Sequence, residues 1–220
     1  MAKVIDILKF LLVTAFCFCV YAGSAGIGEG PGSLGKEVYA GSAGFAQGAV
    51  TGIVGKKQDA KSLRLALQKI YSAELGVREK TGHNDGARVE TYLRYVHLKA
   101  SNPWCAAFIC WSLGQAGIPN PRSGWSPDLL PINKLIWQRS RGLLKQGKTP
   151  KAGDVFGIWF PEKGRIAHVG FIDQWCDKYI ISVEGNTNVS GGIEGDGVYR
   201  RRRMISSIYK VAGYIGGKEL

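Results

Sequence analysis

The chain has 220 residues, of which 45% are hydrophobic and 21% charged, and its formal net charge is +12. This composition is typical of a packed globular protein and excludes a largely disordered one. Residues 1–55 carry as many lysines as acidic residues, so the whole positive excess lies in residues 56–220. A basic folded domain favours polyanionic partners such as nucleic acid, acidic lipid or an anionic cell envelope, and charge alone does not choose among them.

The N-terminus has the layout of a secretory signal. Lys3 and Lys9 precede an uncharged apolar run from Phe10 to Ala22, and small residues follow. The run is shorter than the roughly 20 residues that a membrane span needs. We therefore expect residues 1–25 to be a signal peptide and the protein to be exported to the periplasm, the cell envelope or the medium. An uncleaved N-terminal membrane anchor and a buried N-terminal helix are the alternatives.

Residues 26–55 are rich in glycine, which is typical of a flexible linker. Their later part carries no charge and places Gly44, Gly48 and Gly52 at four-residue spacing, a pattern that lets helices approach closely in a membrane. The linker is the favoured interpretation, because glycine weakens a helix in water, and a membrane-associating segment is the alternative.

Residues 56–220 are expected to form one domain that begins with helices. Apolar residues recur at helical spacing in residues 63–75 and again in residues 89–96, with a loop rich in Gly, Asn and Asp between them. A third helix is predicted from Pro103 to about Ala116, where Gly117 and Pro119 would end it. A long connection with a short helix near residues 131–142 should follow.

From residue 155 onward the pattern changes to short runs of β-branched and aromatic residues that are separated by turn-forming residues. Such runs predict strands. Helices followed by strands indicate an α+β domain, with N-terminal helices packed on a C-terminal antiparallel β-sheet.

The two cysteines on the third predicted helix are expected to have different roles. Cys105 falls in the first turn, where the helix dipole and unpaired N–H groups favour a reactive thiolate. Cys110 lies about 140° further around the helix axis, so the two cannot share one site. A buried structural role is the usual alternative for either cysteine. Cys110 is expected to pack in the core, and a disulfide between Cys110 and Cys176 remains open.

A cysteine hydrolase also needs a base, and the chain has three histidines. His168 interrupts an apolar predicted strand, so it is either a paired core histidine or a base for Cys105. Glu184 or Asn186 on the next predicted strand could accept the second imidazole N–H and orient the ring. The candidates for substrate contact are Trp104, His83 and Asn84.

The segments TGHNDG, NPWCAAF, AHVGFI and VEGNTN occur in an order that resembles the CHAP family, the cysteine- and histidine-dependent amidohydrolases/peptidases. The resemblance spans about residues 63–215 and implies a papain-like fold. It implies Cys105 as the nucleophile, His168 as the general base, Glu184 as the orienting acid and Asn186 as a further polar residue of the site. The reaction it implies is acyl transfer through a thioester.

The family resemblance also implies a substrate, bacterial peptidoglycan. The chain would cut either the amide between muramic acid and the peptide stem or a bond within the peptides. Export and a basic domain agree with this anionic target. Two alternatives remain: a non-catalytic module that binds the wall or inserts into a membrane, and a toxin or lysis protein that uses the same chemistry.

No cofactor and no metal ion are expected. Some CHAP members bind calcium through an Asp-rich loop before the cysteine, and the corresponding region here offers only Asp85 beside Asn84. Nucleic acid is not expected as a partner, because the arginine run 200–203 has only Tyr199 as a neighbouring aromatic platform. Membrane association through the N-terminus and the oligomeric state stay open.

Overall fold

The computed structural model describes residues 59–144, 148–189 and 195–216. The expected signal or anchor in residues 1–25 and the expected linker or membrane-associating segment in residues 26–55 lie outside these residues. No helix in the described part of the chain is both long enough and apolar enough to cross a membrane.

Three helices come first and an antiparallel sheet follows, which confirms the α+β prediction. The helices are α1 (Ala60–Ala73), α2 (Ala87–Tyr95) and α3 (Cys105–Gln115). The strands are β1 (Leu135–Gln138), β2 (Gly142–Leu143), β3 (Val155–Phe160), β4 (Arg165–Trp175), β5 (Tyr179–Thr187), β6 (Gly197–Met204) and β7 (Lys210–Ala212). They form one seven-stranded sheet in the order β2-β1-β7-β3-β4-β5-β6, and every neighbouring pair is antiparallel.

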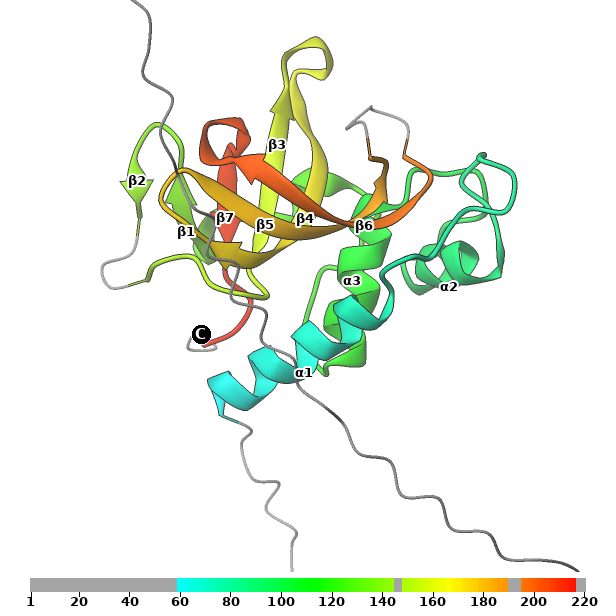
Figure 1. Ribbon diagram of the computed structural model, residues 1–220, viewed down its shortest axis with the longest axis horizontal. Coiled ribbons are helices and arrows are strands. Elements are labelled where there is room, and N and C mark those ends of the chain that lie inside the picture. The colour runs from blue at the N-terminus through cyan, green and yellow to red at the C-terminus, as the bar shows by residue number, and fades with distance from the viewer. Residues whose placement is uncertain (1–58, 145–147, 190–194, 217–220) are drawn as a thin grey trace, which may run out of the picture. The chain divides into compact units, whose positions relative to one another are not determined.

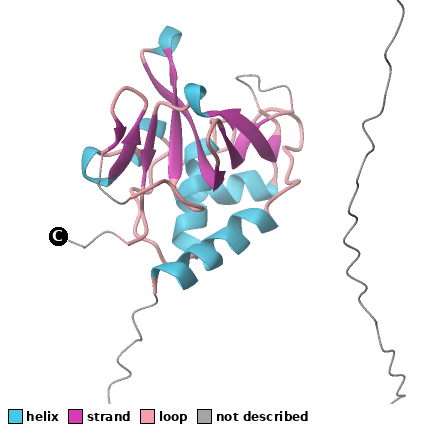
Figure 2. Ribbon diagram, turned by 60° about the vertical axis from the view of Figure 1, so that its left-hand side comes forward, coloured by secondary structure: helices cyan, strands magenta, loops and turns pink. Residues whose placement is uncertain are grey.

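The helices gather on one side of the sheet, with α3 next to the strands (Figures 1 and 2). The main core lies in this layer, where Tyr71 of α1 stacks on Phe171 of β4 and Phe108 of α3 meets the same ring edge-on. Side chains alternate along a strand, so the opposite face of the sheet carries a second, smaller cluster that includes Phe156 and Ile172.

Helix α3 is buried along its length, from Cys105 to Leu113. A helix that is apolar on every side belongs in a core, between two other layers. It begins at Cys105 and not at the expected Pro103, because Trp104 takes a non-helical conformation (φ −124°, ψ 11°) and caps the helix. Cys105 is in the first turn as predicted, and the helix ends within a residue of the expected stop.

The short helix expected near residues 131–142 is wrong. A 3-10 turn covers only Ile132–Lys134, and the chain then enters β1 and β2. β1 pairs with β7, with Leu135 opposite Ala212, so a partner far away in sequence decides the conformation of this segment. Tertiary pairing of this kind overrides the local preference of the residues.

Candidate active site

Cys105 stands at the start of α3 with 5% of its surface exposed. Its Sγ lies 3.6 Å from Oγ of Ser126, which begins a 3-10 turn on the chain segment after the helix. The backbone N–H groups of the first turn of a helix have no partners within the helix, so they are free to bind an anion. The position therefore favours a negative charge on or near the sulfur.

His168 comes from β4, on the sheet side of the site. Its side chain is 12% exposed, and its Nε2 lies 2.7 Å from Oε2 of Glu184. The other ring nitrogen, Nδ1, is left for the thiol of Cys105, with which the ring interacts. The pairing of β3 with β4 shifts just before His168, leaving Ala167 as the extra residue of a bulge. A bulge beside a site commonly re-aims the following side chain.

Glu184 lies on β5 and has no exposed surface. Its carboxylate accepts hydrogen bonds from Nε and Nη2 of Arg203 at 2.6 and 2.5 Å and from Oγ of Ser182 at 2.5 Å, in addition to the contact with His168. Arg203 thus meets the carboxylate with two parallel bonds, the strongest geometry available to this pair. Every oxygen of this buried charge has a partner.

Electrostatics couples the three groups. Burial opposes ionisation of Cys105, but the hydrogen bond and charge of His168, together with Ser126, hold the pKa of the thiol below its ordinary value. Burial alone would lower the pKa of His168, and the bonds to Cys105 and Glu184 raise it to about 9. Burial would raise the pKa of Glu184, and Arg203 and His168 lower it to about 2. The favoured state is therefore thiolate, imidazolium and carboxylate.

Asn186 does not reach the imidazole, although sequence analysis offered it as an alternative to Glu184. Its Oδ1 accepts the backbone N–H of Trp104 at 3.1 Å, directly before the nucleophile helix. Its Nδ2 donates to Oδ1 of Asn84 at 2.9 Å and to the backbone oxygen of Gly195 at 3.1 Å. Asn186 therefore holds the start of α3 and acts on Cys105 through the backbone.

The three residues expected to contact substrate do not form a binding surface. Trp104 has no exposed area; it stacks on Tyr92, and its Nε1 donates to Oε1 of Glu79 at 2.8 Å. This burial contradicts a contact between Trp104 and substrate. The backbone N–H of Asn84 donates to Glu79, and its side-chain oxygen accepts a hydrogen bond from Asn186. His83 is exposed and is not among the residues that line the pocket at Cys105.

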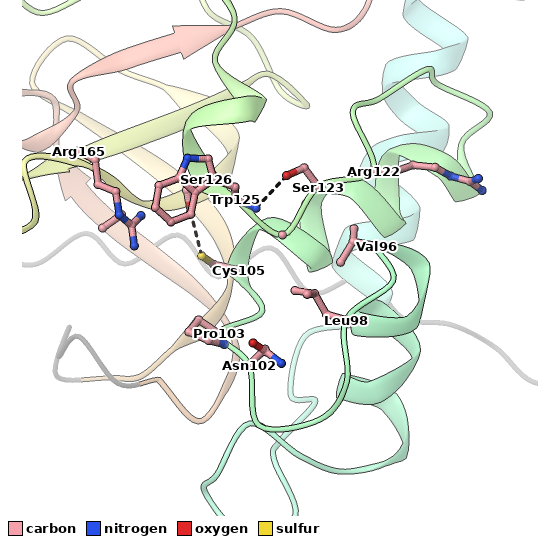
Figure 3. A pocket seen from close by; sticks show the side chains of 12 residues that line it. Val96, Leu98, Asn102, Pro103, Cys105, Arg122, Ser123, Trp125, Ser126 and Arg165 are labelled. Atoms are coloured by element: carbon pink, nitrogen blue, oxygen red, sulfur yellow. Dashed lines mark hydrogen bonds between the residues drawn. The ribbon is translucent and has the colours of Figure 1, made fainter.

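That pocket has a volume of about 540 Å³ and is shown in Figure 3. It is built from the end of α2 and the turn after it, from the start of α3, from residues 122–126 and from the first residues of β4. Cys105 lies between Trp125 and Arg165 on one side and Val96 and Leu98 on the other (Figure 3). The nucleophile candidate therefore opens into this pocket from its floor of helix and strand residues.

Sequence analysis missed Arg203, Ser126, Arg165 and Trp125 as residues of the site. The alternation of side chains in a strand put two arginines of the run 200–203 on each face, but nothing local showed that Arg203 meets Glu184. Ser126 and Trp125 lie on a connection without a periodic pattern. Ser126 reaches Cys105, and Trp125 joins the same pocket, only when that connection folds back over the start of α3.

The remaining cysteines are not part of the site. Cys105, Cys110 and Cys176 are all free, so the open possibility of a bridge between Cys110 and Cys176 is not realised. Cys110 is fully buried, as expected of a core residue, and burial raises the pKa of its thiol to about 11.

Within the described residues, no three His, Cys, Asp or Glu side chains converge in a way that could hold a metal ion. Asp85, the acidic residue of the loop before the cysteine, has its carboxylate bonded to the backbone N–H and the hydroxyl of Thr81, both at 2.9 Å. The carboxylate stabilises the loop that carries Asn84.

Known proteins offer three comparisons. No curated protein matches the chain. Among solved structures, it is similar to a mutated form of the Resuscitation Promoting Factor Interacting protein RipA, with 14% sequence identity and a TM-score of 0.40. The similarity covers 72% of this chain and 64% of that one, less than two thirds of the neighbour's length. Residues 97–186 match the CHAP domain, which confirms the resemblance that the motifs indicated, and Cys105, His168 and Glu184 all lie within the matched segment.

Proposed function

We propose that this protein is a peptidoglycan hydrolase that cuts an amide bond with the thiolate of Cys105. The observation that carries the proposal is the chain of contacts from Cys105 through His168 to the buried carboxylate of Glu184, beside a pocket of about 540 Å³. A histidine with only a structural role in the core would need neither the thiol of Cys105 beside its second ring nitrogen nor partial exposure to solvent. The CHAP domain match supports the substrate class.

In the proposed reaction, the Cys105 proton passes to His168 and the thiolate attacks the amide carbonyl. The negative oxygen of the tetrahedral intermediate is stabilised by backbone N–H groups at the start of α3, which point toward this charge. His168 then protonates the leaving amine, and a thioester remains on Cys105. Water, deprotonated by His168, hydrolyses the thioester and restores the thiol.

Glu184 keeps its charge throughout this cycle. It accepts the N–H of His168, so the ring stays oriented with its other nitrogen toward the sulfur. Arg203 binds the same carboxylate from β6 and keeps it ionised and fixed. Arg203 touches neither substrate nor sulfur in this scheme and is a positioning residue.

The bond that is cut is either the amide between muramic acid and the stem peptide or an amide within the peptides. Both have the carbonyl that the mechanism requires. The basic character of residues 56–220 supports a polyanionic target such as the bacterial wall. Export through residues 1–25 and membrane association of the N-terminal segments complete the proposal and rest on the sequence pattern.

The first prediction concerns the nucleophile. The purified full-length chain is expected to release soluble fragments from isolated peptidoglycan, and Cys105→Ala should abolish the release because no thioester can form. Mass spectrometry of the fragments identifies the cleaved bond directly. Cys176→Ala is the matched control, since Cys176 is also a free thiol, and it should keep full activity. Full activity of Cys105→Ala would contradict the cysteine mechanism, and no release by the unsubstituted chain would leave a wall-binding or membrane-inserting module as the function.

A second prediction concerns the pH at which Cys105 reacts with iodoacetamide. Thiolate is the reactive form, and the lowered pKa should let Cys105 react at a lower pH than an ordinary thiol, whose pKa is about 8.5. Hydrolysis of peptidoglycan should slow above about pH 9, where His168 loses the proton that it must give to the leaving amine. Cys110 should stay unmodified in the same samples. Loss of the low-pH reactivity in His168→Ala is expected; its persistence would contradict the ion pair.

A third prediction tests Arg203. Arg203→Met removes two bonds to a charged group, and we expect kcat/KM to fall roughly tenfold or more. Arg203→Lys should restore part of the loss because it keeps the charge. Arg202→Met removes an exposed arginine from the same strand and should have no such effect. Alkylation of Cys105 at low pH should slow in Arg203→Met, a change that a purely structural role of Arg203 in a folded variant would not produce.

A fourth prediction tests export. The full-length chain should appear outside the cytoplasm, and Leu12→Arg, which places a charge in the apolar run, should retain it inside. Cell fractionation followed by mass spectrometry of the N-terminus measures both location and cleavage. Equal distribution of the two proteins would contradict the signal.

A further inference from the structure

The two sides of the pocket at Cys105 differ in chemistry. On one side, the guanidinium of Arg165 lies over the indole of Trp125, with Cζ 3.9 Å from the ring centroid. Nη1 of Arg165 also donates to the backbone oxygen of Ile166 at 3.0 Å. Planar stacking and a backbone bond fix the guanidinium in place and leave its other N–H groups available.

Trp125 is held as well, although half of its surface is exposed. Its backbone N–H donates to Oγ of Ser123 at 3.0 Å, a bond drawn in Figure 3, and Ser123 donates in turn to Asp128 at 2.6 Å. These bonds hold the exposed indole in a fixed position before any ligand binds. Its outer surface faces solvent beside Cys105.

Arg165 has no acidic partner among the residues that the structure describes. The pocket lining contains arginines and no Asp or Glu. The second arginine, Arg122, stacks over Tyr95 at 4.7 Å, and its side chain extends away from Cys105 (Figure 3). The positive charge on the side of Trp125 is therefore uncompensated, and its natural counterion is a planar carboxylate, which a guanidinium binds with two bonds.

On the opposite side of the pocket, apolar side chains lie beside the amide of Asn102. Val96 and Leu98 form this side together with Gly124, where a Cβ atom would lie only 2.4 Å from Cδ1 of Leu98. Leu98 therefore packs directly against the backbone at Gly124, and Val96 and Leu98 offer hydrocarbon to a ligand on that side. A ligand across Cys105 therefore meets a cation at one end and hydrocarbon at the other.

We infer that Arg165 and Trp125 form a carboxylate subsite that binds a free carboxylate of the stem peptide beside the scissile amide, while Val96 and Leu98 take a small aliphatic side chain. The inference rests on the proposed function, since it concerns the substrate of the same pocket. Its ligand class is an acidic peptide, not the glycan. Amidation of the carboxylate removes the charge and one acceptor, so the subsite discriminates between free and amidated stems.

Binding is measured first, in full-length Cys105→Ala protein, which holds substrate without cutting it. The probes are a synthetic muramoyl peptide with a free glutamyl carboxylate and the same peptide with that group as a primary amide. We expect the amide to bind roughly tenfold more weakly, as for loss of one hydrogen bond to a charged group. Adding Arg165→Gln should remove the preference. Adding Arg202→Gln, which removes an equal charge outside the pocket, should preserve it.

Hydrolysis of the two peptides by the full-length chain separates this inference from the proposed function. Cleavage of both peptides at equal rates, with equal binding, would overturn the subsite and leave the hydrolase intact. Cleavage of neither, with an Arg165-dependent preference in binding, would overturn the hydrolase and leave the subsite intact. A preference that survives Arg165→Gln would place the recognition on another residue and overturn the assignment.

Discussion

The buried charge of Glu184 is the constraint on which the site depends. Removing a carboxylate from water is costly unless donors replace the solvent, and here four hydrogen bonds do so. Two of the three donor side chains carry a cation. Because these donors come from β4, β5 and β6, the carboxylate joins three neighbouring strands as well as orienting His168. The position of the His168 ring is therefore fixed by the pairing of these strands.

The same strand positions the nucleophile. Asn186 follows Glu184 by two residues on β5, adopts a left-handed conformation (φ 53°), and binds the backbone just before Cys105. The loop before α2 joins this network through Asn84 and Glu79. One short stretch of β5 thus sets both halves of the reactive pair, the imidazole through Glu184 and the thiol through Asn186. This arrangement explains how a helix and a sheet that are separate in sequence meet with hydrogen-bond accuracy.

Much of this could be predicted from the sequence, because it depends on local signals. Strand alternation and the change from helical to extended patterns gave the fold class, and turn-forming residues at both ends placed Cys105 in the first turn of α3. The parts that could not be predicted depend on distant partners. Trp104 was expected to contact substrate, but it is buried, with Tyr92 and Glu79 as its partners. Residues 135–138 became a strand because β7 pairs with them. The role of Arg203 depends on the pairing of β6 with β5, which brings its side chain to Glu184.

The bonding of Asn186 to the start of α3 has a consequence for the newly made chain. Before β4 docks on α3, Cys105 lacks the imidazole of His168, whose hydrogen bond and charge lower the pKa of the buried thiol. The reactive pair is thus complete only when segments some 80 residues apart close on one another. Before that contact forms, the chain carries Cys105 without its base.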